Sequence, residues 1–426
     1  MSCWLGMKGW AVSEGKRLVP RLRFPEFRET DEWTSKKLKD ACEVNPTNSV
    51  LPDKFVYIDL ESVEAGKLTA RKTINSDEAP SRAQRLLQLG DVIFQVVRPY
   101  QRNNFHFKTN DSLEYVASTG YAQLRAKDSA DFLFQTVHAD GFVDRVIAKC
   151  TGSSYPAINS SDLAEVPLAI PRLEEQKKIA DCLSSVDELI AAQARKVDAL
   201  KTHKKGLMQQ LFPREGETEP RLRLSEFLGA REWQERKMST SLIKSVSPVD
   251  VDSATTYQEI GIRSHGKGIF HKEPVPGQAL GEKRVFWVVE DALVLNIVFA
   301  WEQALSVTSS AEAGMIASHR FPMFKARIGK ADVNFVKYFF LTKKGKELLG
   351  IASPGGAGRN KTLGKKDFDN LEFLFPSNVE EQNGIANLLS SIDALIVSQI
   401  QQLDTLKIHK KGLMRQLFPS MNGLLA

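Results

Sequence analysis

Apolar residues spaced alternately four and three positions apart predict two long helices, one in the middle of the chain and one near its end. Within each run the same two slots are polar, Gln193 and Lys204 in the first and Gln399 and Lys410 in the second. A four–three spacing sustained over about five heptads is typical of a coiled coil, and polar seam residues restrict its register. We therefore expect the two helices to pair. The predicted seam residues are Ile179, Leu183, Val186, Ile190, Val197, Leu200, Leu207, Leu211, Ile385, Leu389, Ile392, Ile396, Leu403, Leu406, Leu413 and Leu417.

The ends of the first predicted helix follow helix physics. Pro171 precedes it, acidic residues begin it, lysines lie near its end and Pro213 stops it. From Gln176 to Leu211 such a helix would span roughly 54 Å, more than one small domain could cover. Two such helices packed antiparallel would hold their flanking segments about 16 base pairs of duplex DNA apart. The alternative, in which each amphipathic helix packs on its own domain, stays open at this point.

The segments outside the two helices are mixed. Leu89–Val97, Val285–Val289 and Leu293–Phe299 are apolar runs that predict buried strands, whereas residues 131–149 and 334–349 predict helices. Glycines and prolines interrupt these segments frequently. An α+β fold with short strands and few helices follows.

The chain also repeats itself. Pro20-Arg21-Leu22-Arg23 recurs 200 residues later as Pro220-Arg221-Leu222-Arg223, and Trp33 recurs as Trp233. Nearer the helices the offset becomes 206, where residues 203–208 recur unchanged as residues 409–414. Each half therefore contains a segment of about 130 residues that has diverged and a helix of about 40 residues that has not.

The unequal divergence indicates function. Neutral drift after a duplication does not easily explain why one part of each copy changed so much more than the other. We infer that the divergent segments recognise different things, while the similar helices meet identical partners or each other. The boundaries that follow are a leader at 1–19, divergent domains at 20–170 and 214–375, helices at 171–213 and 376–419, and a tail at 420–426.

Composition narrows the class of protein. The 426 residues suffice for two or three domains, and the net charge of +6 excludes neither nucleic acid nor protein as a partner. The four cysteines are scattered, which favours a reducing cytoplasm over a disulfide framework or zinc site. Phe286–Trp301, the most apolar stretch, is shorter than the roughly 20 residues of a membrane span. We expect neither membrane insertion nor secretion.

Candidate DNA-binding residues in the first divergent segment cluster in a local basic stretch with interleaved aromatic and amide side chains. Arginine can hydrogen-bond guanine edges, asparagine can hydrogen-bond adenine edges, and both can hold phosphates. An ordinary solvated loop is the competing interpretation for each of them. The candidates are Arg82, Arg85, Arg98, Tyr100, Arg102, Asn103, Asn104, Lys108 and, in a later loop, Tyr155.

The second divergent segment offers comparable residues. Its glycine-rich loop, residues 354–362, nearly matches a phosphate-binding P-loop but has Asn360 where that pattern needs glycine. An ATP site there is not expected, whereas a loop approaching a DNA backbone fits the residues. The candidates are Lys283, Arg284, Trp287, His319, Arg320, Arg359, Asn360 and Lys361.

Catalytic and metal-binding patterns are missing from the sequence. There is no HExxH motif, no Cys/His cluster and no GxSxG elbow. His203 and His409 occupy matched positions in basic helix ends, where a solvated or carbonyl-capping role is expected. We predict no catalytic residue and no metal site in this chain.

The duplicated features resemble the specificity subunit of type I restriction–modification systems. The resemblance is carried by Pro20–Phe27 with Trp33, the strand start at Gly90–Ile93, the helix start at Leu173–Asp187 and the ending at Lys204–Pro213, with their second copies. It implies two target recognition domains for the halves of a split, asymmetric DNA site, joined by an antiparallel coiled coil in a pseudo-two-fold arrangement.

The resemblance also implies partners. Two methyltransferase subunits would dock on the coiled coil, and two restriction subunits would join for cleavage. The chain itself would have no enzymatic activity and no cofactor, since S-adenosylmethionine, ATP and Mg²⁺ would bind the partners. A coiled-coil scaffold that binds only proteins is the alternative function, and an enzyme in its own right is the weakest one.

Overall fold

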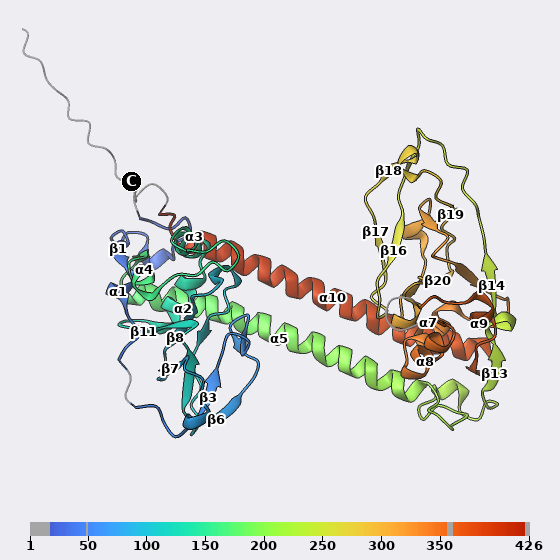
Figure 1. Cartoon of the computed structure of the whole chain (residues 1–426), viewed down its shortest axis with the longest axis horizontal. Helices are drawn as coiled ribbons and strands as arrows, with labels where there is room; N and C mark the ends of the chain where they lie inside the picture. Colours follow the sequence, from blue (N-terminus) through green and yellow to red (C-terminus); the bar gives the residue numbers. More distant parts are fainter. Residues whose placement is uncertain (1–17, 48–49, 356–360, 422–426) are drawn as a thin grey trace, which may run out of the picture. The chain divides into compact units, whose positions relative to one another are not determined.

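The computed structural model describes residues 18–47, 50–355 and 361–421, and its contacts divide the chain into two compact units. Unit 1 comprises the described residues up to Ala194 and from Gln402 onward, and unit 2 runs from Arg195 to Gln401. Both boundaries fall inside long helices (Figure 1). Each unit is therefore built from one divergent segment together with half of each helix. The predicted leader and tail lie mostly outside the described residues.

The two long helices are α5 (Leu173–Leu211) and α10 (Val379–Leu417), each of 39 residues. Every predicted seam residue is buried or half-buried. In unit 1, Leu417 of α10 belongs to the same buried cluster as Ile179 and Leu183 of α5. In unit 2, Leu211 of α5 is buried with Ile385 and Leu389 of α10. Each helix thus packs in the domain of the other copy as well as in its own, and the alternative of two separate amphipathic helices is wrong.

The polar seam residues pair across the two helices. In unit 1 the Lys410 ammonium donates to both carboxylate oxygens of Asp187 at 2.7 Å. In unit 2 Lys204 donates to Asp393 at 2.5 Å, which is the same interaction with the two copies exchanged. Within unit 1, Gln193 also donates to Gln402 at 3.4 Å. Residue numbers rise along α5 as they fall along α10, so the pairing is antiparallel, as predicted.

Unit 1 contains two four-stranded sheets, with strand orders β6-β3-β10-β7 and β2-β11-β8-β9. In the first, β10 runs parallel to β3 and antiparallel to β7. Its elements are β1 (Thr34–Lys37), β2 (Cys42–Val44), β3 (Lys54–Ile58), β4 (Val63–Glu64), β5 (Lys67–Leu68), β6 (Lys72–Asn75), β7 (Ala83–Leu86), β8 (Val92–Gln95), β9 (Phe105–His106), β10 (Tyr115–Ser118), β11 (Tyr121–Ala126), β12 (Pro167–Ile170), α1 (Leu38–Ala41), α2 (Ala130–His138), α3 (Asp140–Ala148), α4 (Ser160–Ala164) and the 3-10 turns η1 (Pro25–Phe27), η2 (Ser76–Glu78) and η3 (Pro99–Gln101).

Unit 2 has one four-stranded sheet, with strand order β14-β23-β20-β21, and several two-stranded ribbons. Its elements are β13 (Gln234–Lys237), β14 (Leu242–Ser245), β15 (Thr256–Tyr257), β16 (Ile260–Ile262), β17 (Ile269–His271), β18 (Val275–Pro276), β19 (Val285–Trp287), β20 (Leu293–Leu295), β21 (Leu305–Val307), β22 (Ile316–Ser318), β23 (Met323–Ala326), β24 (Glu372–Phe375), α6 (Met238–Ser241), α7 (Val333–Phe340), α8 (Lys343–Ile351), α9 (Lys365–Asp369) and the 3-10 turns η4 (Ser225–Phe227), η5 (Gly277–Leu280), η6 (Ala300–Glu302) and η7 (Ser310–Glu312).

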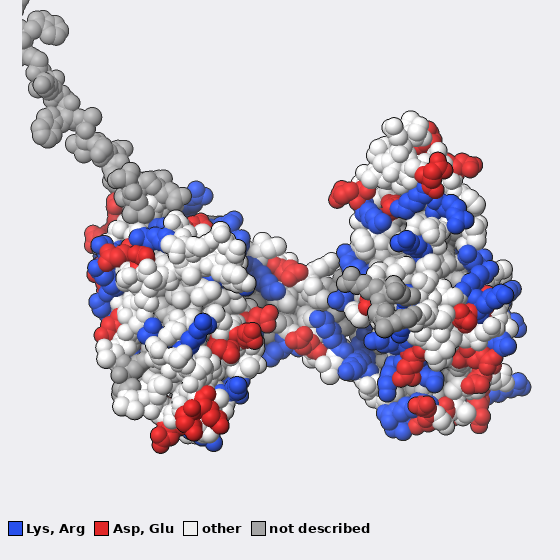
Figure 2. All heavy atoms as spheres, viewed as in Figure 1, with Lys and Arg blue, Asp and Glu red and all other residues white. Residues whose placement is uncertain are grey.

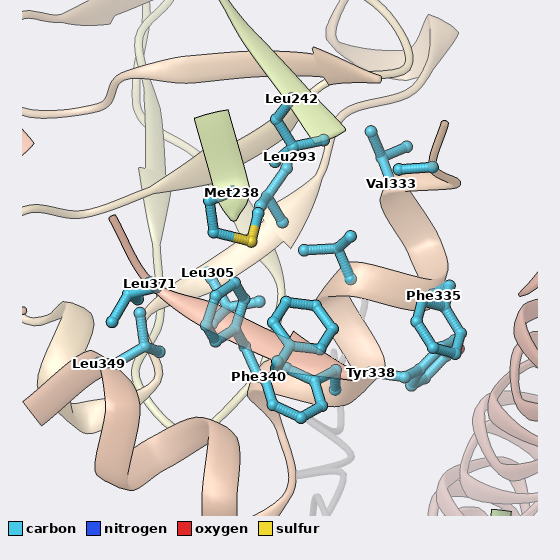
Figure 3. Close-up of a cluster of buried hydrophobic side chains, with 14 of the residues drawn as sticks. Met238, Leu242, Leu293, Leu305, Val333, Phe335, Tyr338, Phe340, Leu349 and Leu371 are labelled. Carbon is cyan, nitrogen blue, oxygen red and sulfur yellow. The ribbon is translucent and has the colours of Figure 1, made fainter. Parts of the chain in front are cut away.

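The core of unit 2 joins the sheet to its helices. Leu242 and Leu293 from strands belong to one buried cluster with Phe335 and Phe340 from α7 (Figure 3). The cluster is rich in aromatic rings, which bury large areas and also pack edge to face. The fold class predicted from the sequence, α+β with two long antiparallel helices, is confirmed.

Two single helices predicted from the sequence are each broken into two. Residues 131–149 form α2 and α3, separated at Ala139, whose backbone is extended. Residues 334–349 fall in α7 and α8, and the Thr342 side chain accepts a hydrogen bond from Gly345 N to begin α8. A Cβ at Gly345 would lie 2.2 Å from the Phe339 carbonyl oxygen, so glycine permits this tight turn between the helices.

A matched buried ion pair ties each copy's first segment to a long helix. In unit 1, Arg23 donates to both carboxylate oxygens of Glu175, at 2.9 and 2.8 Å, and Trp33 Nε1 donates to the same group at 3.2 Å. In unit 2 the residues 200 and 206 positions later make the same contacts at 2.8, 2.9 and 3.2 Å. The repeated sequence therefore preserves a structural anchor. No helix among the described residues is long and apolar enough to cross a bilayer.

Candidate nucleic-acid interface

Three loops meet at one place in unit 1. Val96, just after β8, donates its N–H to the carbonyl of Gly120 at 3.0 Å and accepts from Ile158 N at 3.1 Å. Arg98 N donates to the Pro156 carbonyl at 2.8 Å. These bonds hold together the loop after β8, the turn after β10 and the loop before α4. We call this meeting point the loop junction of unit 1.

Unit 2 builds the same junction from matched positions. Ile297 N donates to the Arg320 carbonyl at 3.0 Å, and Leu363 N donates to the Ile297 carbonyl at 2.8 Å. The turn after β10 in unit 1 and the turn after β22 in unit 2 also begin with a matched hydrogen bond. Thr119 N donates to the Arg82 carbonyl, and His319 N donates to the Arg284 carbonyl. The two units therefore share a backbone scaffold here, and their differences lie in the side chains that it carries.

Arg98 and Tyr155 form the centre of the junction in unit 1. The Arg98 guanidinium lies 4.3 Å from the centroid of the Tyr155 ring, a cation–π contact between two of the loops. Tyr155 is 65% exposed and Tyr100, on the turn η3, is 51% exposed. Arg98 and Arg102 flank η3 with left-handed backbones, at φ of 54° and 56°. Such strain in residues other than glycine costs free energy and is typical of functional loops.

Other predicted residues of unit 1 hold the fold together. Arg102 donates to the His138 carbonyl at 3.0 Å and to Asp140 at 2.8 Å, and Lys108 pairs with Asp131. The Asn103 side chain accepts from the backbone N–H of residue 65 at 3.3 Å.

Asn104 is fully buried, and its side-chain oxygen accepts from Gln95 N at 2.9 Å. DNA binding by Asn104 would require an accessible side chain, and in this structure its side chain is not accessible. The amide satisfies a strand end inside the domain, and the sequence could not distinguish the two roles.

Arg82 and Arg85 each lack a charged partner among the described residues. Arg82 is exposed beside the junction. Arg85 is half-buried, its Nε atom has no hydrogen-bond partner, and burial lowers the pKa of its guanidinium. An unpaired buried donor costs free energy, which a DNA phosphate or base edge could recover.

In unit 2 the aromatic and basic partners exchange loops. Trp301, on the turn η6, occupies the place of Tyr100, and its ring centroid lies 5.4 Å from the Lys361 ammonium. The aromatic residue thus comes from the 3-10 turn and the cation from the later loop, the reverse of Arg98 and Tyr155. Trp301 was not predicted, although its position 201 residues after Tyr100 was a usable signal. Arg359 and Asn360 lie outside the described residues.

The remaining candidates of unit 2 lie along the paired strands β19 and β22. Arg284, His319 and Arg320 are exposed together at one end of this ribbon. Lys283 instead pairs with Glu259, and Trp287 packs against Tyr257 with ring centroids 6.1 Å apart. Acidic and basic side chains both occur, in separate small groups among uncharged ones, on the visible face of each unit (Figure 2). Among the described residues no His, Cys, Asp and Glu group could hold a metal ion.

Comparison with known proteins first gives the class. Residues 30–202 match the family described as the type I restriction modification DNA specificity domain. The resemblance noted from the sequence is thereby confirmed.

Particular relatives agree with this assignment. The chain is 27% identical over 265 residues to the putative type I restriction enzyme MjaX specificity subunit of Methanocaldococcus jannaschii, covering 61% of this chain and 60% of that relative. The chain thus matches less than two thirds of that relative's length.

Solved structures share the fold. A type I restriction-modification S subunit from M. genitalium superposes with a TM-score of 0.56 at 14% identity, covering 95% of this chain and 100% of the other. A chain from a structure described as the basis of complex assembly and conformational transition of the type I R-M system gives a TM-score of 0.53 at 20% identity, covering 91% and 97%. At these identities the likeness establishes the fold alone.

Proposed function

We propose that this chain is the DNA-specificity subunit of a type I restriction–modification complex. Each unit would bind one half of a bipartite, asymmetric DNA site through its loop junction. One observation carries the proposal: two junctions built on matched backbone hydrogen bonds of Val96 and Ile297 present unlike side chains, Arg98 with Tyr155 in one and Lys361 with Trp301 in the other. Equal scaffolds with unequal contacts suit two different DNA sequences.

The paired helices would supply the parts common to both halves. We propose that α5 and α10 set the spacing between the two DNA half-sites and dock two methyltransferase subunits. The matched ion pairs of Lys204 with Asp393 and Lys410 with Asp187 support a pairing in fixed register. Two restriction subunits would complete the cleaving complex.

Catalysis would belong to the partners. We assign methyl transfer to the methyltransferase subunits, which would bind S-adenosylmethionine, and ATP- and Mg²⁺-dependent cleavage to the restriction subunits. The chain would contribute DNA binding and assembly and would work in the cytoplasm.

Methylome sequencing tests this function. The chain, expressed with its methyltransferase partner in cells that lack other methylation, should produce one asymmetric motif interrupted by a fixed spacer. Methylation without such a motif would contradict the proposal.

A scaffold that binds only proteins is the second candidate, favoured by the ion pairs that already engage Arg102, Lys108 and Lys283. DNA binding by the assembled complex, weakening linearly in log affinity with log salt, would eliminate it.

A further inference from the structure

A basic cavity of about 660 Å³ lies within unit 1, apart from the Arg98–Tyr155 contact. Its walls come from the segment before η1, the turn η3, helices α2 and α3, and the last turns of α10. Seven of the lining residues are lysine or arginine and two are aspartate. The cavity therefore has a strong excess of positive charge.

Some of these charges are already compensated. Arg102 and Arg415 both donate to Asp140, at 2.8 and 2.9 Å. Lys410 is engaged by Asp187 in the helix seam. These three cations shape the cavity without needing a ligand.

Three other cations have no direct ion pair with any residue that the structure describes. Arg21 and Lys411 are exposed at the edge of the cavity. Arg145 is half-buried, and its Nε donates to the Pro167 carbonyl at 3.0 Å, which leaves its two terminal nitrogens without a described partner. Because unpaired charge is costly to remove from water, the burial of Arg145 indicates a place where an anion would be stabilised.

Apolar side chains also line the cavity. Phe142 and Leu168 are buried, Met414 and Phe418 are half-buried, and Tyr100 stands exposed at the rim. Apolar surroundings lower the local dielectric and strengthen the attraction between the cations and an anion. Cations together with aromatic and apolar side chains suit a ligand that carries both a phosphate and a ring.

We propose that this cavity binds a phosphate group. A terminal phosphate carries up to two negative charges and three acceptor oxygens, a backbone phosphate carries one charge and two free oxygens, and arginine binds either of them in a bidentate fashion. The phosphate could belong to a free nucleoside phosphate, for which a cavity of this size is typical. It could instead be a backbone phosphate of bound DNA, since Tyr100 and Arg102 adjoin the loop junction, and that source rests on the proposed function.

The second copy of the repeat does not preserve this chemistry. Because α3 and α8 align at an offset of 203, Leu348 stands where unit 1 has Arg145. On the long helices, at an offset of 206, Gln209 replaces Arg415 while Lys205 matches Lys411. The repeat thus supplies its own controls: Arg145→Leu introduces the residue of the other copy, and Lys205→Gln makes the same change as Lys411→Gln outside the cavity.

Titration of the full chain with inorganic pyrophosphate, followed by calorimetry, tests the site directly. We expect binding to one site, weakened about tenfold by either Arg145→Leu or Lys411→Gln, the effect of losing one charge-assisted hydrogen bond. Lys205→Gln should bind as the wild type does. Lys411 is exposed, so its variant remains informative if the Arg145 variant folds poorly.

Duplex binding by the chain with its methyltransferase partner distinguishes the two phosphate sources. A DNA phosphate is the ligand if pyrophosphate does not bind and both cavity variants lower the affinity for target and non-target duplexes equally. Lys205→Gln should then leave both affinities unchanged. The proposal would be overturned if Lys205→Gln and Lys411→Gln had equal effects, or if the cavity variants changed neither pyrophosphate binding nor duplex binding. It would also be overturned if the variants impaired only assembly with the methyltransferase partner. A chain that binds pyrophosphate but no DNA would refute the proposed function and leave this site standing.

Discussion

Arg98 shows, at the scale of a single residue, how the loop junction is maintained. Its left-handed backbone costs about 1 kcal/mol relative to glycine, yet the residue holds both a backbone bond to Pro156 and a stacking contact with Tyr155. Glycine at this position would remove the strain and the contact together. Stability and DNA binding should therefore respond differently to its replacement.

Arg98→Gly should change the free energy of unfolding by no more than about 1 kcal/mol, because relief of strain offsets the lost contact. DNA affinity should fall about tenfold or more, as for loss of one charged DNA contact. Urea unfolding and fluorescence anisotropy measure the two quantities. Ala65→Gly is the control, since Ala65 also has a positive φ, of 48°, but lies outside the junction. A loss of stability without a loss of affinity would make Arg98 a structural residue.

His138 gives unit 1 a pH dependence. Burial, reinforced by the charge of Lys410, lowers its pKa to about 4. The unfolded chain binds this proton below about pH 6.5, whereas the folded chain binds it only near pH 4. The free energy of unfolding should therefore decrease as the pH falls through this interval, by about 2 kcal/mol for one histidine at pH 5.

The measurement is urea unfolding at pH 7 and pH 5, an interval in which the carboxylates of the unfolded chain stay mostly ionised. His106, whose pKa burial also lowers to about 4, should contribute in the same direction. His138→Leu, which introduces the residue found at matched position 341, should show a smaller difference between the two pH values. An unchanged difference would exclude His138 as a source.

At the scale of elements, the long helices were predictable and the loop junctions were not. A four–three spacing is a local property of the sequence, so α5 and α10 and their seam followed from it. The contact of Arg98 with Tyr155 joins residues more than 50 positions apart and depends on backbone bonds from two other loops. No local sequence pattern predicts this contact. The internal repeat indicates only that the two units place these loops in similar positions.

The prediction of one unbroken helix at residues 131–149 and another at 334–349 failed for a related reason. Apolar periodicity continues through Ala139 and through Leu341, so the pattern favours one helix in each place. The structure breaks them because Ala139 adopts an extended backbone and Thr342 caps a new helix. Asn104 illustrates the same limit at a site, because its burial depends on a strand end that only the fold defines.

The cross-helix ion pairs allow a charge-exchange test of this element. Lys204→Asp alone should place two carboxylates together and lower the free energy of unfolding of unit 2 by about 1–2 kcal/mol. Lys204→Asp combined with Asp393→Lys should recover most of that loss. Urea unfolding of both variants gives the coupling energy, with the same exchange at Lys410 and Asp187 as the matched case in unit 1. A double variant no more stable than the single would show that the pair does not set the register.

At the scale of the whole molecule, we expect the long helices to set the spacing between the half-sites and the loop junctions to recognise them. Shortening α5 and α10 by one heptad each removes about 10 Å of helix, equivalent to about 3 base pairs. The methylated motif should then keep both half-sites and lose spacer length. Methylome sequencing reports this directly, and an intact spacer in an active variant would remove the helices from that role.

The most direct test of independent recognition by the two units is a methylome for a variant altered in one junction alone. With Arg98→Ala and Tyr155→Ala combined in unit 1, sequencing should show one half of the motif relaxed while the other half and the spacer stay as in the wild type. Relaxation of both halves together, or a motif identical to that of the wild type, would contradict the account.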